Sequence, residues 1–215
     1  MIGGEAFVPS AIAPYPDLEA SASTSIPAPD VDTTHDVNLP ASIQADEKLV
    51  MAVAIWAGAS RTISTPSGWT AEGTESSEGG FRRVSIFSKT ASGSEGSTVT
   101  VTTSGTIGGL AALTYRFSDA GEVVAETVDG NSAAPNPPNL DRTTEAKRKW
   151  LAGTWAEPPF TGDPADYEDA LQASATYGLR ILSRDRKISA ENPAAFALDA
   201  TDANWIAFTI GVDPA

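Results

Sequence analysis

Short apolar segments separated by turn residues constrain the fold of this chain more than any other feature. Residues 48–56 (KLVMAVAIW) are apolar on both faces, which is typical of a strand in the centre of a sandwich. Other segments alternate between apolar and polar residues, as half-buried strands do. These further strand candidates are residues 81–89, 97–103, 110–117, 149–155, 177–184 and 204–212. Because Gly, Pro, Asp and Asn punctuate them, the sequence predicts an all-β, jelly-roll-like antiparallel β-sandwich.

The first 20 residues differ from the rest. Three prolines interrupt any helix there, and the apolar residues between them need another surface to pack against. We therefore predict an extended N-terminal arm over residues 1–20 and a single jelly-roll sandwich over residues 21–215, with a frayed terminus as the alternative. The arm residues that we expect to dock on a partner are Phe7, Val8, Ile12 and Tyr15. One short helix is predicted over residues 164–172, opening at Asp163 with Pro164 in its first position.

Charge and composition exclude several classes of protein. The formal net charge is −14, which repels phosphate backbones and argues against nucleic-acid binding. There is no cysteine, so disulfides and thiolate chemistry are excluded. No apolar run approaches the length of a membrane span. The start of the sequence, MIGGE, lacks the basic and apolar regions of a secretion signal, so we expect a soluble protein made in the cytoplasm.

A search for catalytic and metal-binding residues returns nothing. The single histidine, His35, precedes Asp36, but neighbours on a strand point to opposite faces and cannot form a relay. The acidic residues are too numerous to select a glycosidase pair. The acidic stretch 163–169 could supply oxygen ligands to calcium but lacks the EF-hand spacing. We predict no enzymatic activity, no cofactor and no metal.

The aromatic and basic residues leave two questions open. Three of the five tryptophans lie in or at the ends of apolar strands, where burial is the default. Trp155, just before a Pro-Pro pair, is the best candidate for an exposed ring that stacks on a sugar, and Trp69 is the second. The basic clusters 147–149 and 184–187 predict charged strand edges or hairpin tips, with partner docking as the alternative.

Residues 35–117 carry a resemblance to a known family. The segments VNLPASIQADEKLVMAVAIW, TISTPSGWT, VSIFSKTASGSEGSTVTVT and LAALTYRF follow one order, and the later LAGTWAE and NWIAFTIGVDP extend it. The chain resembles the phage tail-fibre and head-accessory β-sandwich proteins, which have "P-x-G-W-T" and "K-x-A-x-G-x-E" segments. The resemblance covers residues 20–213 and leaves the arm unmatched. One departure is Asp46-Glu47, where the family more often has Gly-Asp.

The resemblance implies a non-enzymatic virion component: a head decoration protein, a head spike or fibre base, or a tail accessory protein. It would be made in the host bacterial cytoplasm and lie on the virion surface. Its partners would be the major capsid, fibre or tail proteins and further copies of itself. The alternative is a carbohydrate-binding module that contacts host surface glycans through Trp155 and Trp69. A glycan-cleaving enzyme is the third hypothesis and the least supported, since no carboxylate pair stands out.

Overall fold

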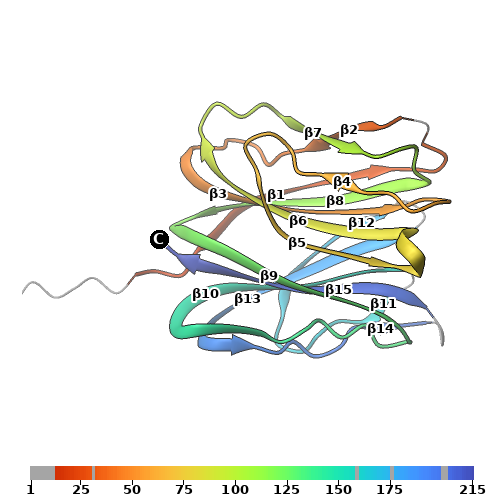
Figure 1. Cartoon of the computed structure of the whole chain (residues 1–215). Coiled ribbons are helices and arrows are strands. Elements are labelled where there is room, and N and C mark those ends of the chain that lie inside the picture. Colours follow the sequence, from red (N-terminus) through yellow and green to blue (C-terminus); the bar gives the residue numbers. More distant parts are fainter. Residues whose placement is uncertain (1–12, 31, 158–159, 175–176, 200–202) are drawn as a thin grey trace, which may run out of the picture.

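The computed structural model describes residues 13–30, 32–157, 160–174, 177–199 and 203–215, and within them the chain is almost entirely β-structure. Antiparallel sheets pack in layers (Figure 1). The middle sheet has the order β1 (Asp17–Ile26), β8 (Gly109–Ser118), β3 (Ala45–Trp56), β6 (Arg82–Ser92), β5 (Thr70–Ser77). The upper sheet has the order β2 (Thr34–Asn38), β7 (Thr98–Thr103), β4 (Ile63–Ser64).

A lower sheet packs on the other face of the middle sheet, as the stacking in Figure 1 shows. Its order is β12 (Glu168–Ser174), β13 (Gly178–Glu191), β10 (Leu140–Ala156), β15 (Asn204–Pro214), β9 (Ala120–Asn131). The small elements are η1 (Glu78–Gly80), a 3₁₀ turn, and the paired strands β11 (Phe160–Gly162) and β14 (Ala197–Leu198). The all-β sandwich predicted from the sequence is therefore confirmed.

Six of the first eight strands form three nested pairs. β1 pairs with β8, β2 with β7, and β3 with β6. This nesting is the double Greek-key winding of a jelly roll. It spans residues 17–118, and β9, β10, β12, β13 and β15 form the lower sheet that covers its outer face.

β3 shows why residues 48–56 are apolar on both faces. Val50, Ala52 and Ala54 pack into the core between the middle and lower sheets. The intervening residues, including Met51 and Val53, pack into the core between the middle and upper sheets. Both sets are almost completely buried. The strand is apolar throughout because its sheet is the middle layer of three.

Two sequence predictions of local structure are wrong. The arm ends earlier than residue 20, because β1 begins at Asp17 and pairs with β8 from there. The predicted helix over residues 164–172 does not form: a turn precedes β12, which pairs with β13. Positive φ angles at Asp166 (65°) and Asp169 (52°) are incompatible with a helix, and cross-strand pairing replaces the local capping signal.

Large aromatic rings lie over glycines directly opposite them in the lower sheet. The cross-strand pairs are Gly153 with Phe208, Gly211 with Trp150, and Gly130 with Trp205. A Cβ atom added to Gly153 would overlap the Phe208 ring, and one on Gly211 would lie 3.1 Å from the Trp150 ring. The absence of a side chain on one strand therefore makes room for the aromatic side chain of the next.

Gly153→Ala should destabilise the fold by about 3 kcal/mol, because the added methyl group forces Phe208 out of the packed core. Gly58→Ala is the matched control, since a Cβ there meets no atom within 4 Å. It should change stability by less than about 0.5 kcal/mol. Urea unfolding of both variants measures the difference, and equal stabilities would contradict the packing argument.

Candidate functional site

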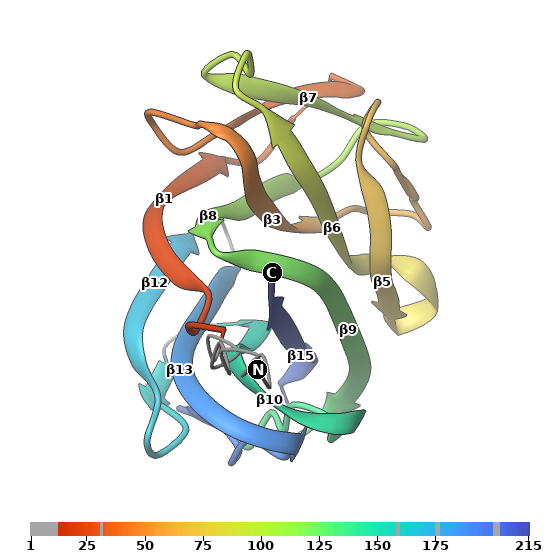
Figure 2. The ribbon, with the colours of Figure 1, turned by 90° about the vertical axis from the view of Figure 1, so that its left-hand side faces the viewer.

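The chain enters the described structure at one end of the sandwich, seen face-on in Figure 2. The Nζ atom of Lys147 lies 5.5 Å from the centroid of the Tyr15 ring, and Pro16 is buried. The end of β15 lies at the same end of the molecule. We call this the arm-bearing end and define it by Tyr15, Asp17, Lys147 and Asp213 together with the side chains that contact them.

The predicted docking residues are only partly described. Phe7, Val8 and Ile12 lie outside the described residues, so their role stays a prediction. Tyr15 is described and is half-buried against Lys147 of its own chain. Its ring therefore lies against the lower sheet at the start of the described chain, and its role in docking stays a prediction.

The two basic clusters meet at the arm-bearing end. Lys147 is the register partner of Lys187, and Arg148 is the partner of Arg186. Such pairs of like charges repel each other unless carboxylates intervene. Lys149 has strand partners on both sides, so the prediction of a strand edge is wrong for it, whereas Lys147 and Arg148 are paired only with β13. The sequence gives each cluster separately, and only the strand register brings them together.

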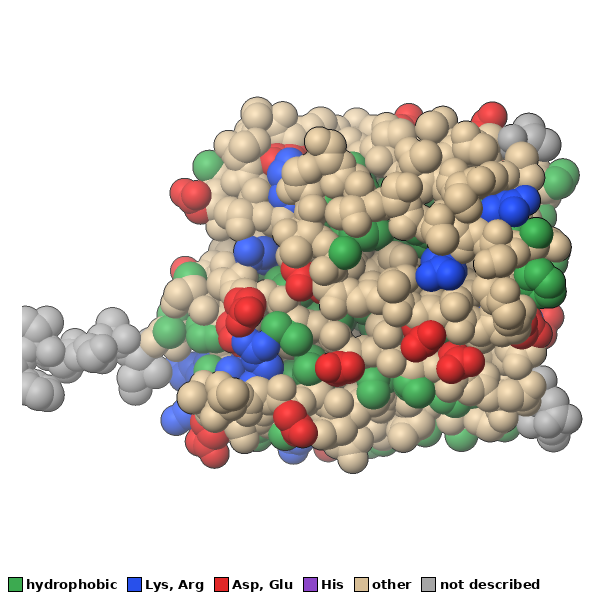
Figure 3. All heavy atoms as spheres, in the orientation of Figure 1, with side chains coloured by type: hydrophobic (Ala, Val, Ile, Leu, Met, Phe, Trp, Pro, Cys, Tyr) green, Lys and Arg blue, Asp and Glu red, His purple; other side chains and the backbone are tan. Residues whose placement is uncertain are grey.

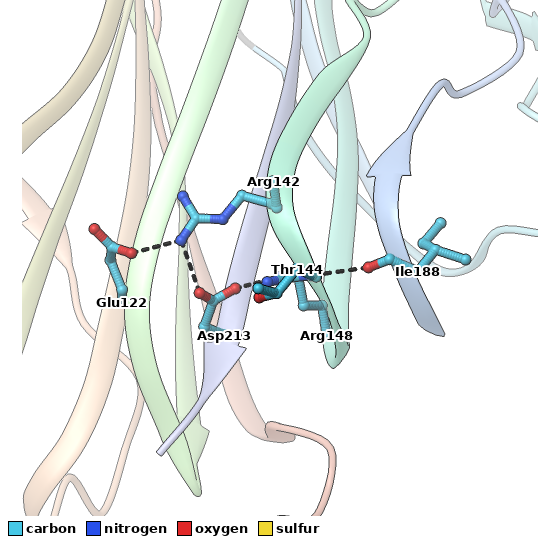
Figure 4. Close-up of polar contacts among 6 residues, drawn as sticks. All are labelled: Glu122, Arg142, Thr144, Arg148, Ile188 and Asp213. Atoms are coloured by element: carbon cyan, nitrogen blue, oxygen red, sulfur yellow. Dashed lines mark hydrogen bonds and ion pairs between the residues drawn. The ribbon is translucent and has the colours of Figure 1, made fainter.

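Arg148 of the first cluster belongs to a network of two arginines and two carboxylates (Figure 4). Asp213 of β15 accepts hydrogen bonds from Arg142, at 2.7 Å, and from Arg148. Arg142 also donates to Glu122 of β9. Burial disfavours the charge of Arg142, but the hydrogen bonds to Glu122 and Asp213 outweigh it and raise the pKa. Arg148 is buried and also reaches two carbonyl oxygens at 2.8 Å, those of Thr144 and Ile188.

A cleft of about 380 Å³ opens at the same end, between the edge strands β1 and β12. We call it the β1–β12 cleft; Figure 2 shows both strands from this side. Its lining residues are Asp17, Leu18 and Ser21 of β1, Lys149 of β10, and Asp169, Ala170 and Leu171 of β12. Lys149 is buried and pairs with Asp185 at 2.9 Å. The walls therefore combine carboxylates, a hydroxyl and apolar side chains.

Both strands that wall the cleft contain register shifts. The pairing of β12 with β13 shifts between Glu168 and Leu171, and Asp169 within this bulge has a φ of 52°. The Oγ atom of Ser183 donates a hydrogen bond to the Asp169 carboxylate at 3.1 Å. The pairing of β1 with β8 shifts after Leu18. β-Bulges redirect side chains, and Asp169 in the β12 bulge is exposed and lines the cleft.

Tyr115 of β8 belongs to the core between the middle and lower sheets and does not line the β1–β12 cleft. It is the register partner of Ser21, so both side chains project from the same face of the middle sheet. Its side chain is buried, and its hydroxyl has no hydrogen-bond partner among the described residues. Burial and, second, the negative charge of Asp169 raise its pKa far above the ordinary value. The hydroxyl therefore keeps its proton and remains able to donate.

The two tryptophans proposed for glycan stacking are buried. Trp155 is 2% exposed and faces the core between the middle and lower sheets. The Tyr177 ring packs edge-on against it at 5.4 Å, and the Arg82 guanidinium lies 4.5 Å from the centroid of the Tyr177 ring. The expectation that Trp155 is exposed is wrong, because β10 continues to Ala156 and its alternation turns Trp155 inward. Trp69 is 8% exposed and packs under the upper sheet.

The two motifs that carry the family resemblance lie side by side. The turn before Trp69 is closed by a hydrogen bond from its N–H to the Pro66 carbonyl at 3.1 Å, with Gly68 at a φ of 77°. The Lys89 side chain passes over Gly68 and forms an ion pair with Glu95 at 3.0 Å. Both motifs thus act as structural turns. Asp46, at a position where the family more often has glycine, has a φ of 68°.

His35 belongs to a buried hydrogen-bond network. Its Nδ1 atom lies 2.9 Å from the Asp30 carboxylate, and its Nε2 atom lies 3.1 Å from the Thr103 hydroxyl, which donates to the Gly105 carbonyl at 2.9 Å. His35 and Thr103 are each 3% exposed, which keeps substrates away. As expected, Asp36 points to the other face of the strand. The network ties β2 to β7.

The acidic stretch 163–169 does not converge on one point. Asp163 pairs with Arg180 through both carboxylate oxygens, whereas Asp169 accepts from Ser183. Among the described residues, no group of three or more Asp, Glu or His side chains is arranged to hold a metal ion. The same residues include no helix long and apolar enough to cross a membrane.

Asp213→Asn should destabilise the protein by about 2 kcal/mol, because it leaves the buried Arg148 without its carboxylate. Glu122→Gln, which changes the exposed carboxylate of the same network, should cost less than about 0.5 kcal/mol. Chemical denaturation at low ionic strength compares the two. Equal losses would show that burial does not determine the strength of this network.

Glu95→Gln should weaken the fold by about 1 kcal/mol near neutral pH. Burial opposes ionisation, but hydrogen bonds from the Ser92 backbone and from Lys89 lower the pKa of Glu95 from 4.5 to about 2. The carboxylate therefore stabilises the fold above pH 4.5, and this contribution disappears as the pH falls toward 2. Thermal unfolding from pH 7 to pH 2 should show the wild-type and variant curves converging in acid; a constant gap would contradict the assignment.

Comparisons with protein-family models, with curated protein sequences and with solved structures find no match to this chain. The resemblance to phage accessory proteins therefore rests on the two turn motifs and the order of the strands. Any assignment of function depends on the fold and on the geometry of the arm-bearing end.

Proposed function

We propose that this chain is a non-enzymatic structural component of a phage or phage-like virion that docks through its N-terminal arm. It would serve as a head decoration protein, a head spike or fibre base, or a tail accessory protein on the virion surface. Its partners would be the major capsid, fibre or tail proteins and other copies of the chain. The nested pairing of β1 to β8 is the observation that carries the proposal, because jelly rolls recur in viral capsid domains.

The construction of the arm-bearing end supports docking there. Tyr15 lies against Lys147 of the lower sheet, Pro16 is buried, and β1 is hydrogen-bonded to β8 from Asp17 onward. Force applied to the arm would therefore pass directly into the middle sheet. The charge network of Arg142, Arg148 and Asp213 fixes the neighbouring strand ends. A rigid end next to a short apolar segment suits attachment to a preassembled surface.

The surface of the rest of the molecule supports a decorating role. The face in Figure 3 consists mainly of backbone and of side chains that are neither hydrophobic nor charged, with charged groups scattered between them. With a formal net charge of −14, such a surface keeps the protein soluble before assembly. Copies arrayed on a symmetric shell would then bind through many weak contacts.

Removing residues 1–12 should abolish incorporation into particles without unfolding the domain, because all the strands that the structure describes begin after that segment. Particles would be purified on a density gradient from a host that carries the gene. The number of copies per major capsid protein would be measured by quantitative mass spectrometry. We expect at least a tenfold loss for the truncated chain and an unfolding temperature close to that of the full chain.

A matched variant separates the apolar side chains from the length of the arm. Phe7→Ser, Val8→Ser and Ile12→Ser together keep the chain length and should lose incorporation as the truncation does. Full incorporation of either altered chain would overturn docking through the arm. Failure of the full chain to purify with particles would overturn the virion role itself.

A further inference from the structure

His35 of β2 lies between a carboxylate and a hydroxyl. Its Nδ1 atom lies 2.9 Å from Oδ2 of Asp30, and its Nε2 atom lies 3.1 Å from Oγ1 of Thr103 in β7. The side chains of His35 and Asp30 are 1% and 8% exposed. Among the described residues, the imidazole is the only polar group that reaches Oδ2 of Asp30. A carboxylate buried in this way needs a positive charge or a proton beside it.

The hydrogen bonds around the ring count its protons. Oγ1 of Thr103 donates its single proton to the Gly105 carbonyl at 2.9 Å, so it can only accept from Nε2, and Nε2 carries a proton. Oδ1 of Asp30 accepts the backbone N–H of Asp32 at 3.0 Å. The remaining contact, between Oδ2 and Nδ1, joins two acceptors and needs a second proton between them. The pair of Asp30 and His35 therefore holds one proton more than a neutral imidazole beside a carboxylate.

Loss of that extra proton changes the partner of Thr103. A neutral imidazole keeps one N–H, and the negative charge of Asp30 favours its position on Nδ1. Nε2 then becomes an acceptor, and the Thr103 hydroxyl has to turn from the Gly105 carbonyl toward Nε2. The deprotonated ring therefore competes with Gly105 for a single hydroxyl proton.

Gly105 belongs to the loop 104–108, which joins β7 to β8. The loop is also tied to Asp30 itself, whose N–H donates to the Ile107 carbonyl at 3.2 Å, and the N–H of Ser104 donates to the Thr62 carbonyl at 3.0 Å. β8 leaves this loop and ends at Ser118, beside Asp17 of the arm-bearing end. The loop 104–108 therefore lies at the opposite end of the molecule.

Few other charges act on the ring. β7 and β4, which form the sheet with β2, contain no charged residue. Asp32 contributes its backbone to Asp30, and its side chain is exposed. Asp36 projects from the other face of β2. Arg61 packs over Gly105 and donates to backbone carbonyls. Asp30 is thus the charged group in contact with the imidazole.

We propose that His35, Asp30 and Thr103 form a pH-dependent latch on the loop 104–108. The protonated ring leaves the Thr103 hydroxyl on Gly105 and holds the loop to β2. As the pH rises and the ring loses its proton, the hydroxyl turns to Nε2 and the loop is released. The stabilising contact is therefore present in acid and lost at higher pH. The proposal is independent of the virion role, since it concerns the end opposite the arm.

The chain contains one histidine, so NMR observes this ring alone. Imidazole ¹⁵N spectra of the full chain from about pH 5 to pH 9 should show both nitrogens protonated in acid and Nδ1 alone protonated at high pH. Amide exchange would be measured over the same range as protection factors, which remove the intrinsic effect of pH on exchange. Protection at Asp30 and Ser104 should fall at least tenfold as the ring deprotonates, while protection in β3 stays constant.

Three variants test the coupling. Thr103→Val removes the hydroxyl, so protection of the loop should no longer follow the ring. Thr103→Ser keeps the hydroxyl and should keep the coupling. Asp36→Asn is the matched control, because this carboxylate on the other face of β2 accepts from Thr100, and it should reproduce the wild-type curves.

Four results would each overturn the latch. The first is a ring that keeps one protonation state from about pH 5 to pH 9. The second is loop protection that does not follow the ring in the wild-type chain or in Thr103→Ser. The third is loop protection that still follows the ring in Thr103→Val. The fourth is a parallel loss of protection in β3, which would show unfolding of the whole domain instead of release of one loop.

Discussion

Burial of the middle sheet on both faces is the constraint on which the rest of the structure depends. Its central strands β8 and β3 are therefore apolar along most of their length, and most of the buried polar groups on them have a partner. Thr114, at 1% exposure, donates its hydroxyl proton to the Asn38 carbonyl at 2.7 Å. Arg116, at the end of the same strand, pairs with Glu47 at 2.7 Å. Because packing on both faces holds the middle sheet in place, the upper and lower sheets can differ in size.

Strands that satisfy this constraint were predictable, and strands at the edges were not. Residues 48–56, 110–117 and 204–212 are recognisable because burial demands long apolar stretches. β1 is built mainly of Ser and Ala, and β12 is acidic, so neither carries a strong pattern. In β12 the local signals of Asp163 and Pro164 favour a helix. Pairing with β13 overrides them, because a hydrogen-bonded ladder and the burial of Ala173 outweigh a cap.

The sequence pattern does not predict the β1–β12 cleft, for a related reason. Asp17 and Asp169 meet only because β1 and β12 end up side by side at the edges of different sheets. No spacing in the sequence encodes that meeting. The prolines after Trp155 suggest a loop and an exposed ring. In the structure, β10 extends beyond Trp155, and the ring lies in the core. His35 was correctly separated from Asp36, but its carboxylate partner Asp30 precedes its strand and gives no periodic signal.

The glycine–aromatic pairs of the lower sheet have a consequence for how this chain can vary. In each pair, an aromatic ring on one strand fills the space above the glycine of the next strand. The size of the residue at one position therefore limits the size that fits at the other. A substitution at Gly153 is tolerated only together with a smaller residue at Phe208, and Gly211 is linked to Trp150 in the same way. Related sequences should therefore show these distant positions changing together, as compensated pairs whose combined volume stays constant.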